Sequence, residues 1–181
     1  MGYDMGKTIK KLAIGGLIAA SATGAMAATQ GTTGFISTGD LFITLTVNDE
    51  VKISNLADIN LGVFAGVDAV GTSPACIYRN TGSAYSLTAT GSGAGNAFEL
   101  TDPGATTSVA YTVAYDDASG FSGMATGVAL NSTGAAGADN DCATNPGGDN
   151  GLVQVTVSAA AGAALPALVY TGTLTLVVAP I

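Results

Sequence analysis

The stretch Gly39–Val47, GDLFITLTV, limits most strongly what this chain can fold into. If it is extended, its apolar side chains fall on one face and polar ones on the other, with Phe42 as the exception, which is the period-2 pattern of a half-buried strand. The preceding segment, TQGTTGFISTG, offers no core of its own. The strand therefore needs a sheet elsewhere, in its own chain or in a neighbouring molecule. Its apolar face comprises Leu41, Ile43, Leu45 and Val47.

Residues 1–27 have the three parts of an export signal. Lys7, Lys10 and Lys11 form a basic start, Leu12–Ala20 is apolar, and Ala25-Met26-Ala27 is a small-x-small cleavage site. Glycines interrupt the apolar part, which is well short of the ~20 residues that a membrane span needs. We therefore expect a signal peptide over residues 1–27, export from the cell, and no membrane span in the mature chain.

The charge of the mature chain excludes several kinds of partner. Removing residues 1–27 from the 181 leaves 154 residues, enough for one domain. These include two basic residues, Lys52 and Arg79, and twelve acidic ones (the 13 of the whole chain less Asp4), so the formal charge is −10. An acidic chain of this kind has no electrostatic basis for binding nucleic acid or an anionic membrane.

The sequence contains no signature of catalysis. It has no histidine, so the usual general base is missing. Two cysteines without histidine do not complete a zinc site. We expect neither an enzyme nor a bound cofactor or metal. Two carboxylates that meet in space, as in glycosidases, are the enzymatic alternative.

The only cysteines, Cys76 and Cys142, predict one disulfide, because an even pair in an exported protein is usually oxidised. Cys142 lies in residues 131–151, a polar stretch that is long for an untethered loop in a compact domain. The disulfide would tether it. The aspartates of this stretch leave calcium binding open, although their spacing does not follow the EF-hand pattern. They are Asp139, Asp141 and Asp149.

The rest of the chain has a β pattern throughout, with short alternating segments about every ten residues. Val109, Tyr111, Val113 and Tyr115 share one face, and a turn is expected at residues 116–120. Pro180 is expected to stop the last strand early. We predict an all-β fold, an antiparallel sandwich. The expected strands cover residues 51–56, 57–64, 76–80, 83–91, 98–101, 108–117, 152–160 and 168–178.

Four features in this order resemble the subunits of chaperone–usher fimbriae, in particular the archaic and spore-coat-U-like branch. They are the strand and its continuation GDLFITLTVNDEVKI, the D-I-N-L-G element at Asp58–Gly62, a middle cysteine, and the terminal YTGTLTLVV. The resemblance implies an immunoglobulin-like β-sandwich that lacks its last strand. A periplasmic chaperone would first lend that strand, and the N-terminal extension of the next subunit would then replace it by β-strand addition.

The same resemblance assigns roles along the chain. Residues 28–48 would be the N-terminal extension and residues 49–181 the pilin-like domain. The donor side chains would be Leu41, Ile43, Leu45 and Val47, and the terminal strand beside the acceptor groove would present Tyr170, Leu174, Leu176 and Val178.

Two functions follow from the two ways of pairing Gly39–Val47. Pairing with a neighbour implies a structural subunit of a fimbria or pilus-like filament on a Gram-negative cell, used for attachment or biofilm. Its partners would be copies of itself, a periplasmic chaperone and an outer-membrane usher. Pairing within the chain implies a secreted or surface-bound β-sandwich that binds carbohydrate or protein, with Tyr78 and Phe121 as candidate aromatic contacts.

Overall fold

The computed structural model describes residues 28–81, 84–132, 134, 136, 137, 139–143 and 148–181. The signal peptide expected at residues 1–27 lies outside them. The chain divides into two units, Met1–Thr46 and Val47–Ile181. In the first unit, Thr29 and Asp40 form an isolated antiparallel bridge with backbone hydrogen bonds of 2.9 and 3.0 Å. No helix in the described part of the chain is long and apolar enough to cross a membrane.

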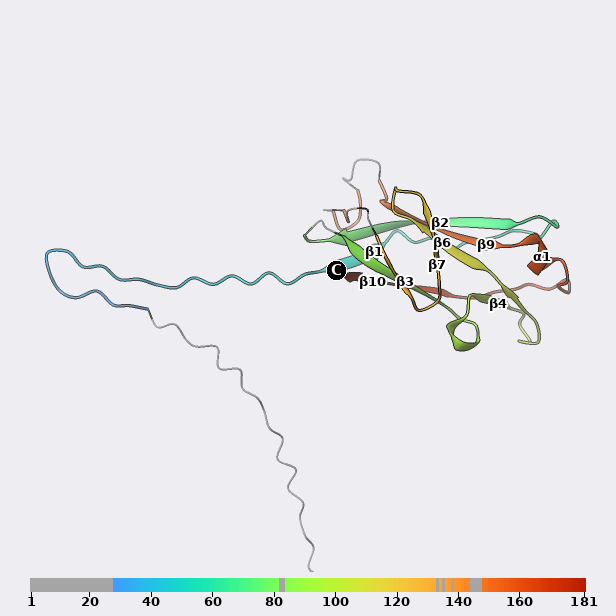
Figure 1. The fold of residues 1–181 in the computed structure, drawn as a ribbon, viewed down its shortest axis with the longest axis horizontal. Helices are drawn as coiled ribbons and strands as arrows, with labels where there is room; N and C mark the ends of the chain where they lie inside the picture. The colour runs from blue at the N-terminus through green and yellow to red at the C-terminus, as the bar shows by residue number, and fades with distance from the viewer. Residues whose placement is uncertain (1–27, 82–83, 133, 135, 138, 144–147) are drawn as a thin grey trace, which may run out of the picture. The chain divides into compact units, whose positions relative to one another are not determined.

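The second unit is an antiparallel β-sandwich, as the alternating sequence predicts (Figure 1). One sheet has the strand order β1-β2-β9-β6-β7, the other has β10-β3-β8, and β4 pairs with β5. A single helical turn, α1 at Ala159–Gly162, follows β9 and is capped by the Ser158 side chain. The strands are β1 Val51–Ser54, β2 Ala69–Arg79, β3 Tyr85–Gly91, β4 Glu99–Thr101, β5 Ser108–Ala110, β6 Thr112–Asp116, β7 Phe121–Met124, β8 Ala129–Asn131, β9 Gly151–Val157 and β10 Leu174–Pro180.

The core lies between the two sheets. The predicted face of residues 109–115 is confirmed, because its four apolar side chains are all buried. Tyr85 of β3 meets Tyr115 of β6 edge to face, with ring centroids 6.5 Å apart and hydroxyl oxygens 2.7 Å apart. Burial raises the pKa of both phenols. The contact therefore joins the sheets with neutral, hydrogen-bonded hydroxyls in an apolar surrounding.

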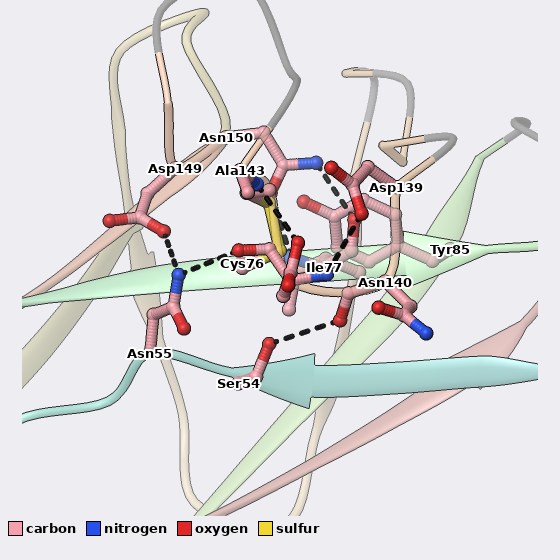
Figure 2. Close-up of a disulfide and its surroundings, with 12 residues drawn as sticks. Ser54, Asn55, Cys76, Ile77, Tyr85, Asp139, Asn140, Ala143, Asp149 and Asn150 are labelled. Carbon is pink, nitrogen blue, oxygen red and sulfur yellow. Dashed lines mark hydrogen bonds between the residues drawn. A yellow bond between two sulfur atoms is a disulfide. The ribbon is translucent and has the colours of Figure 1, made fainter.

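Cys76 and Cys142 form a disulfide, with their Cα atoms 5.8 Å apart (Figure 2). Ala75 and Ile77 belong to the core, so Cys76 between them points to the outer face of the sheet. Cys76 is nevertheless fully buried, and Cys142 is almost fully buried. The long loop is therefore tied down over β2 at Cys142. A disulfide is also consistent with an exported protein.

The same loop continues the pairing of β2 beyond the end of β9. The Asn150 side chain accepts a hydrogen bond from the Ile77 amide and donates one to its carbonyl oxygen, both 2.8 Å long. The Gly137 amide also donates to the Ile77 carbonyl oxygen at 2.8 Å. This edge of β2 is therefore covered by the loop (Figure 2).

The strand predicted at residues 57–64 is absent, and that prediction was wrong. Asn55 adopts a left-handed φ of 62° and ends β1. Its side chain donates to the Asp141 carbonyl oxygen at 3.0 Å and to the Asp149 carboxylate at 2.7 Å, which holds the turn (Figure 2). Beyond it, Ile59 packs over Gly71, where a Cβ would lie 2.5 Å from Ile59 Cγ2. Residues 57–64 thus pack against the core without pairing with a strand of the sheet.

Two details of the terminal strand also differ from prediction. It begins at Leu174 rather than at residue 168, because Thr171 forms only an isolated bridge with Thr101. Pro180 does not stop the strand, since it is paired with Tyr85 as its last residue. A proline is tolerated at the end of an edge strand, where one missing N–H costs little.

The disulfide is expected to stabilise the sandwich substantially. Its sequence separation is 66 residues, and closing a loop of that size contributes up to about 4 kcal/mol through the entropy of the unfolded chain. Reduction should lower the free energy of unfolding by up to that amount, measured by urea denaturation with and without reductant. The double variant Cys76→Ala/Cys142→Ala is the control and should not respond to reductant. An unchanged urea midpoint in the reduced protein would contradict this role.

Candidate functional site: the unpaired edge of β10

Strand β10 lies at the edge of its sheet. It pairs with β3 over seven positions, from Leu174 opposite Gly91 to Pro180 opposite Tyr85. Among the described strands, none pairs with its other edge. β1 is likewise the last strand of the five-stranded sheet, and it contacts β10. Figure 1 shows the two strands close together near the C-terminus.

On the inner face of the three-stranded sheet, the side chains of β10 are less buried than those of β3. Leu87 and Ala89 of β3 are fully buried. Val178 and Leu176 lie opposite them in register and pack against the core, but are only half-buried. Leu174 continues this row. We call the unpaired side of β10, with Leu174, Leu176 and Val178, the acceptor edge.

The other strands that end the two larger sheets are shorter. β7 and β8 end their sheets with four and three residues, whereas β10 has seven. Short edge strands offer little template for pairing with another chain, and long apolar ones invite it. The acceptor edge is therefore the place on this sandwich best suited to receive a strand.

Tyr170 lies ahead of β10 rather than in it. It is half-buried and packs against the core. Its hydroxyl lies 3.1 Å from the Thr107 hydroxyl oxygen and donates to the Pro166 carbonyl oxygen at 3.3 Å. The structure thus brings Leu174, Leu176 and Val178 into one strand and places Tyr170 at the approach to it.

The four apolar residues expected on the donor strand are exposed. The accessible fractions of Leu41, Ile43, Leu45 and Val47 are 72, 81, 85 and 72%, respectively. Residues 41–50 lie in no strand of the described chain. An alternating apolar row of this kind remains available for burial elsewhere.

Asp102 organises the approach to β10, a role that the sequence analysis missed. Its carboxylate accepts hydrogen bonds from the amides of Gly104, Thr106 and Thr107 at 3.0, 2.8 and 2.6 Å. The bond from Thr107 is the largest of the influences that lower the pKa of Asp102 to about 2. Since Thr107 also meets Tyr170, this turn supports the segment leading into the acceptor edge. The signal was the Asp-Pro-Gly sequence, which favours a turn closed by the aspartate side chain.

The aspartates of the long loop serve local hydrogen bonds. The Asp141 carboxylate accepts from the Ala143 amide at 3.0 Å, and Asp149 accepts from Asn55. One group of potential metal ligands occurs among the described residues, formed by Cys76, Cys142 and Asp149. Both sulfurs of that group are joined in the disulfide and are not thiolate ligands. Calcium binding by the loop stays an untested alternative.

Comparison with solved structures finds four similar chains. No protein-family description and no curated protein matches the sequence. A chain from a study titled "Chaperone-tip adhesin complex is vital for synergistic activation of CFA/I fimbriae biogenesis" is similar in structure, with a TM-score of 0.48 and 19% sequence identity. The similarity covers 74% of this chain and 42% of that chain. The present chain therefore spans less than half of the solved one.

The carboxylate of Asp102 is expected to stabilise the fold only above acidic pH. Its pKa falls from the ordinary 3.8 to about 2 on folding, so its contribution is complete above the unfolded value and is lost as pH falls between these values. Asp102→Asn should lower the urea midpoint at pH 7, and the difference from wild type should shrink as pH approaches 2. Asp58→Asn, at an exposed site, is the control and should be neutral. An equal loss at both pH values would contradict the electrostatic cause.

Proposed function

We propose that this protein is a structural subunit of an extracellular fimbria-like filament that polymerises by donor-strand exchange. The supporting observation is the acceptor edge, a seven-residue unpaired strand edge beside a half-buried apolar row. In this proposal the domain at residues 49–181 is an immunoglobulin-like sandwich without its last strand. Residues 28–48 of a second copy supply that strand.

The donor suits the edge in length and pattern. Leu41–Val47 spans seven residues, as β10 does, and alternates apolar and polar side chains with only Phe42 out of pattern. A strand added to β10 would place one face over the core and satisfy backbone groups along the edge. Burying four large aliphatic side chains contributes roughly 6 to 12 kcal/mol before the cost of ordering the strand.

The proposal carries expectations about export and partners. A subunit with an unpaired apolar edge needs protection before assembly, so a periplasmic chaperone and an outer-membrane usher are its expected partners in a Gram-negative cell. Attachment and biofilm formation are the expected roles of the filament, with no catalysis. The competing function is the binding of carbohydrate or protein by a complete sandwich, in which Leu41–Val47 pairs with a strand of its own chain.

A matched pair of variants tests this function in the full mature chain. Ile43→Asp places a carboxylate on the face that would be buried, and Thr44→Asp places the same carboxylate on the opposite face. Burying an unpaired carboxylate costs well over the 1.4 kcal/mol that gives a tenfold effect, so Ile43→Asp should reduce filament yield by about tenfold or more. Thr44→Asp should polymerise like wild type. Yield is measured by sedimentation and electron microscopy.

Normal filaments from Ile43→Asp would show that this face is not buried in the assembly. Equal loss in both variants would show that charge alone prevents association. Either result would contradict the assigned donor face.

A further inference from the structure

Arg79 is an unusual residue in this chain. It and Lys52 are the basic residues that follow residue 27. Its side chain is buried, with 7% of its surface accessible, although it ends β2. A buried guanidinium must be paired and hydrogen-bonded to be tolerated.

The guanidinium forms a fork with Asp49 and reaches two backbone oxygens. Nε donates to Asp49 Oδ1 at 3.0 Å and Nη2 to Oδ2 at 2.5 Å. Nη1 donates to the carbonyl oxygen of Ala84 and, at 2.9 Å, to the backbone oxygen of Ile181. The hydrogen bond from Arg79 lowers the pKa of the Asp49 carboxyl below its ordinary 3.8, so the pair is charged at neutral pH.

One side chain therefore joins segments that flank the acceptor edge. Asp49 lies two residues before β1, and Ile181 directly follows β10. The tether to Ile181 comes at a weak point, because Pro180 has no N–H to add to the ladder and strand ends fray. Arg79 holds the end of β10 where backbone pairing does not.

The neighbouring Asn80 fixes the residues on both sides of Asp49. Its side chain accepts a hydrogen bond from the Glu50 amide at 3.1 Å and donates one to the Asn48 carbonyl oxygen at 2.6 Å. Its own amide donates to the Glu50 carbonyl oxygen at 3.1 Å. Residues 48–50, which join the N-terminal extension to β1, are thus attached to the end of β2 by three bonds besides the ion pair.

We propose that Arg79 is a positioning residue for strand exchange, which fixes the base of the donor segment at Asn48–Glu50 and the end of the acceptor edge at Ile181 as one rigid unit. This rests on the proposed function. The physical basis of the proposal is pre-organisation. When the acceptor edge is already ordered, binding of the donor strand does not include the cost of ordering that edge. Without the guanidinium, the end of β10 and the base of the donor segment move independently, and each exchange event becomes slower.

The test compares filament growth rates of full-length mature variants at equal concentration. Arg79→Met keeps much of the aliphatic stem and removes all five donors. It should slow growth about tenfold, which corresponds to about 1.4 kcal/mol. Arg79→Lys keeps the charge without the fork and should recover part of the rate. Asp49→Asn keeps both backbone contacts of Arg79 and should fall between wild type and Arg79→Met. These two milder variants carry the test if Arg79→Met does not fold.

The variant Val153→Ala distinguishes a general loss of stability from a loss of positioning. It removes part of a core side chain in β9, away from the contacts of Arg79. Its melting temperature is measured beside those of the Arg79 and Asp49 variants. Slower growth of the Arg79 variants than of Val153→Ala at comparable melting temperature would support positioning. Growth that simply follows melting temperature in all variants would overturn it. Failure of the wild-type protein to polymerise would instead refute the proposed function on which this inference rests.

Discussion

The feature on which the proposed function depends is the edge of β10 that pairs with no described strand. A strand edge carries backbone donors and acceptors that need partners, and here it borders an apolar row that the core only half covers. One position further into the sheet, the same face is fully buried in β3. A single added strand would supply both the missing backbone partners and the missing cover. The exposed, alternating residues Leu41–Val47 have the pattern of such a strand.

Hydrogen bonds and the disulfide fix other parts of the sandwich, while the shorter edge strands β7 and β8 also have a neighbouring strand on one side only. Asn150 and Gly137 pair β2 beyond the end of β9, in a loop that the disulfide attaches to the sheet. The approach to β10 is supported by the Asp102 turn through Thr107 and Tyr170. Its far end is held by Arg79 at Ile181. β10 is therefore anchored at both ends, and its edge away from β3 pairs with no described strand, which is what a strand template requires.

Sequence patterns predicted those strands in which apolar and polar residues alternate because one face is buried. Residues 109–115 alternate because one face fills the core, and the even cysteine pair in a chain with the pattern of an export signal predicted the disulfide. Residues 57–64 alternate too, yet they form no strand, because Asn55 with its left-handed φ turns the chain out of the sheet. A periodic pattern of apolar residues does not show where the pairing of a strand ends. The contacts of Arg79 and Asp102 join positions far apart or depend on turn geometry. The roles of Arg79 at both Asp49 and Ile181 follow only from the three-dimensional arrangement.

The most direct test of strand exchange is to run the native protein on SDS gels, unheated and boiled, beside negative-stain electron microscopy. Non-covalent exchange predicts thin fibres and a ladder of multimers that survives SDS in the cold and collapses to a monomer on boiling. A single monomer band in both lanes, with no fibres, would contradict the account. That result would favour the competing function, a self-complete binding module.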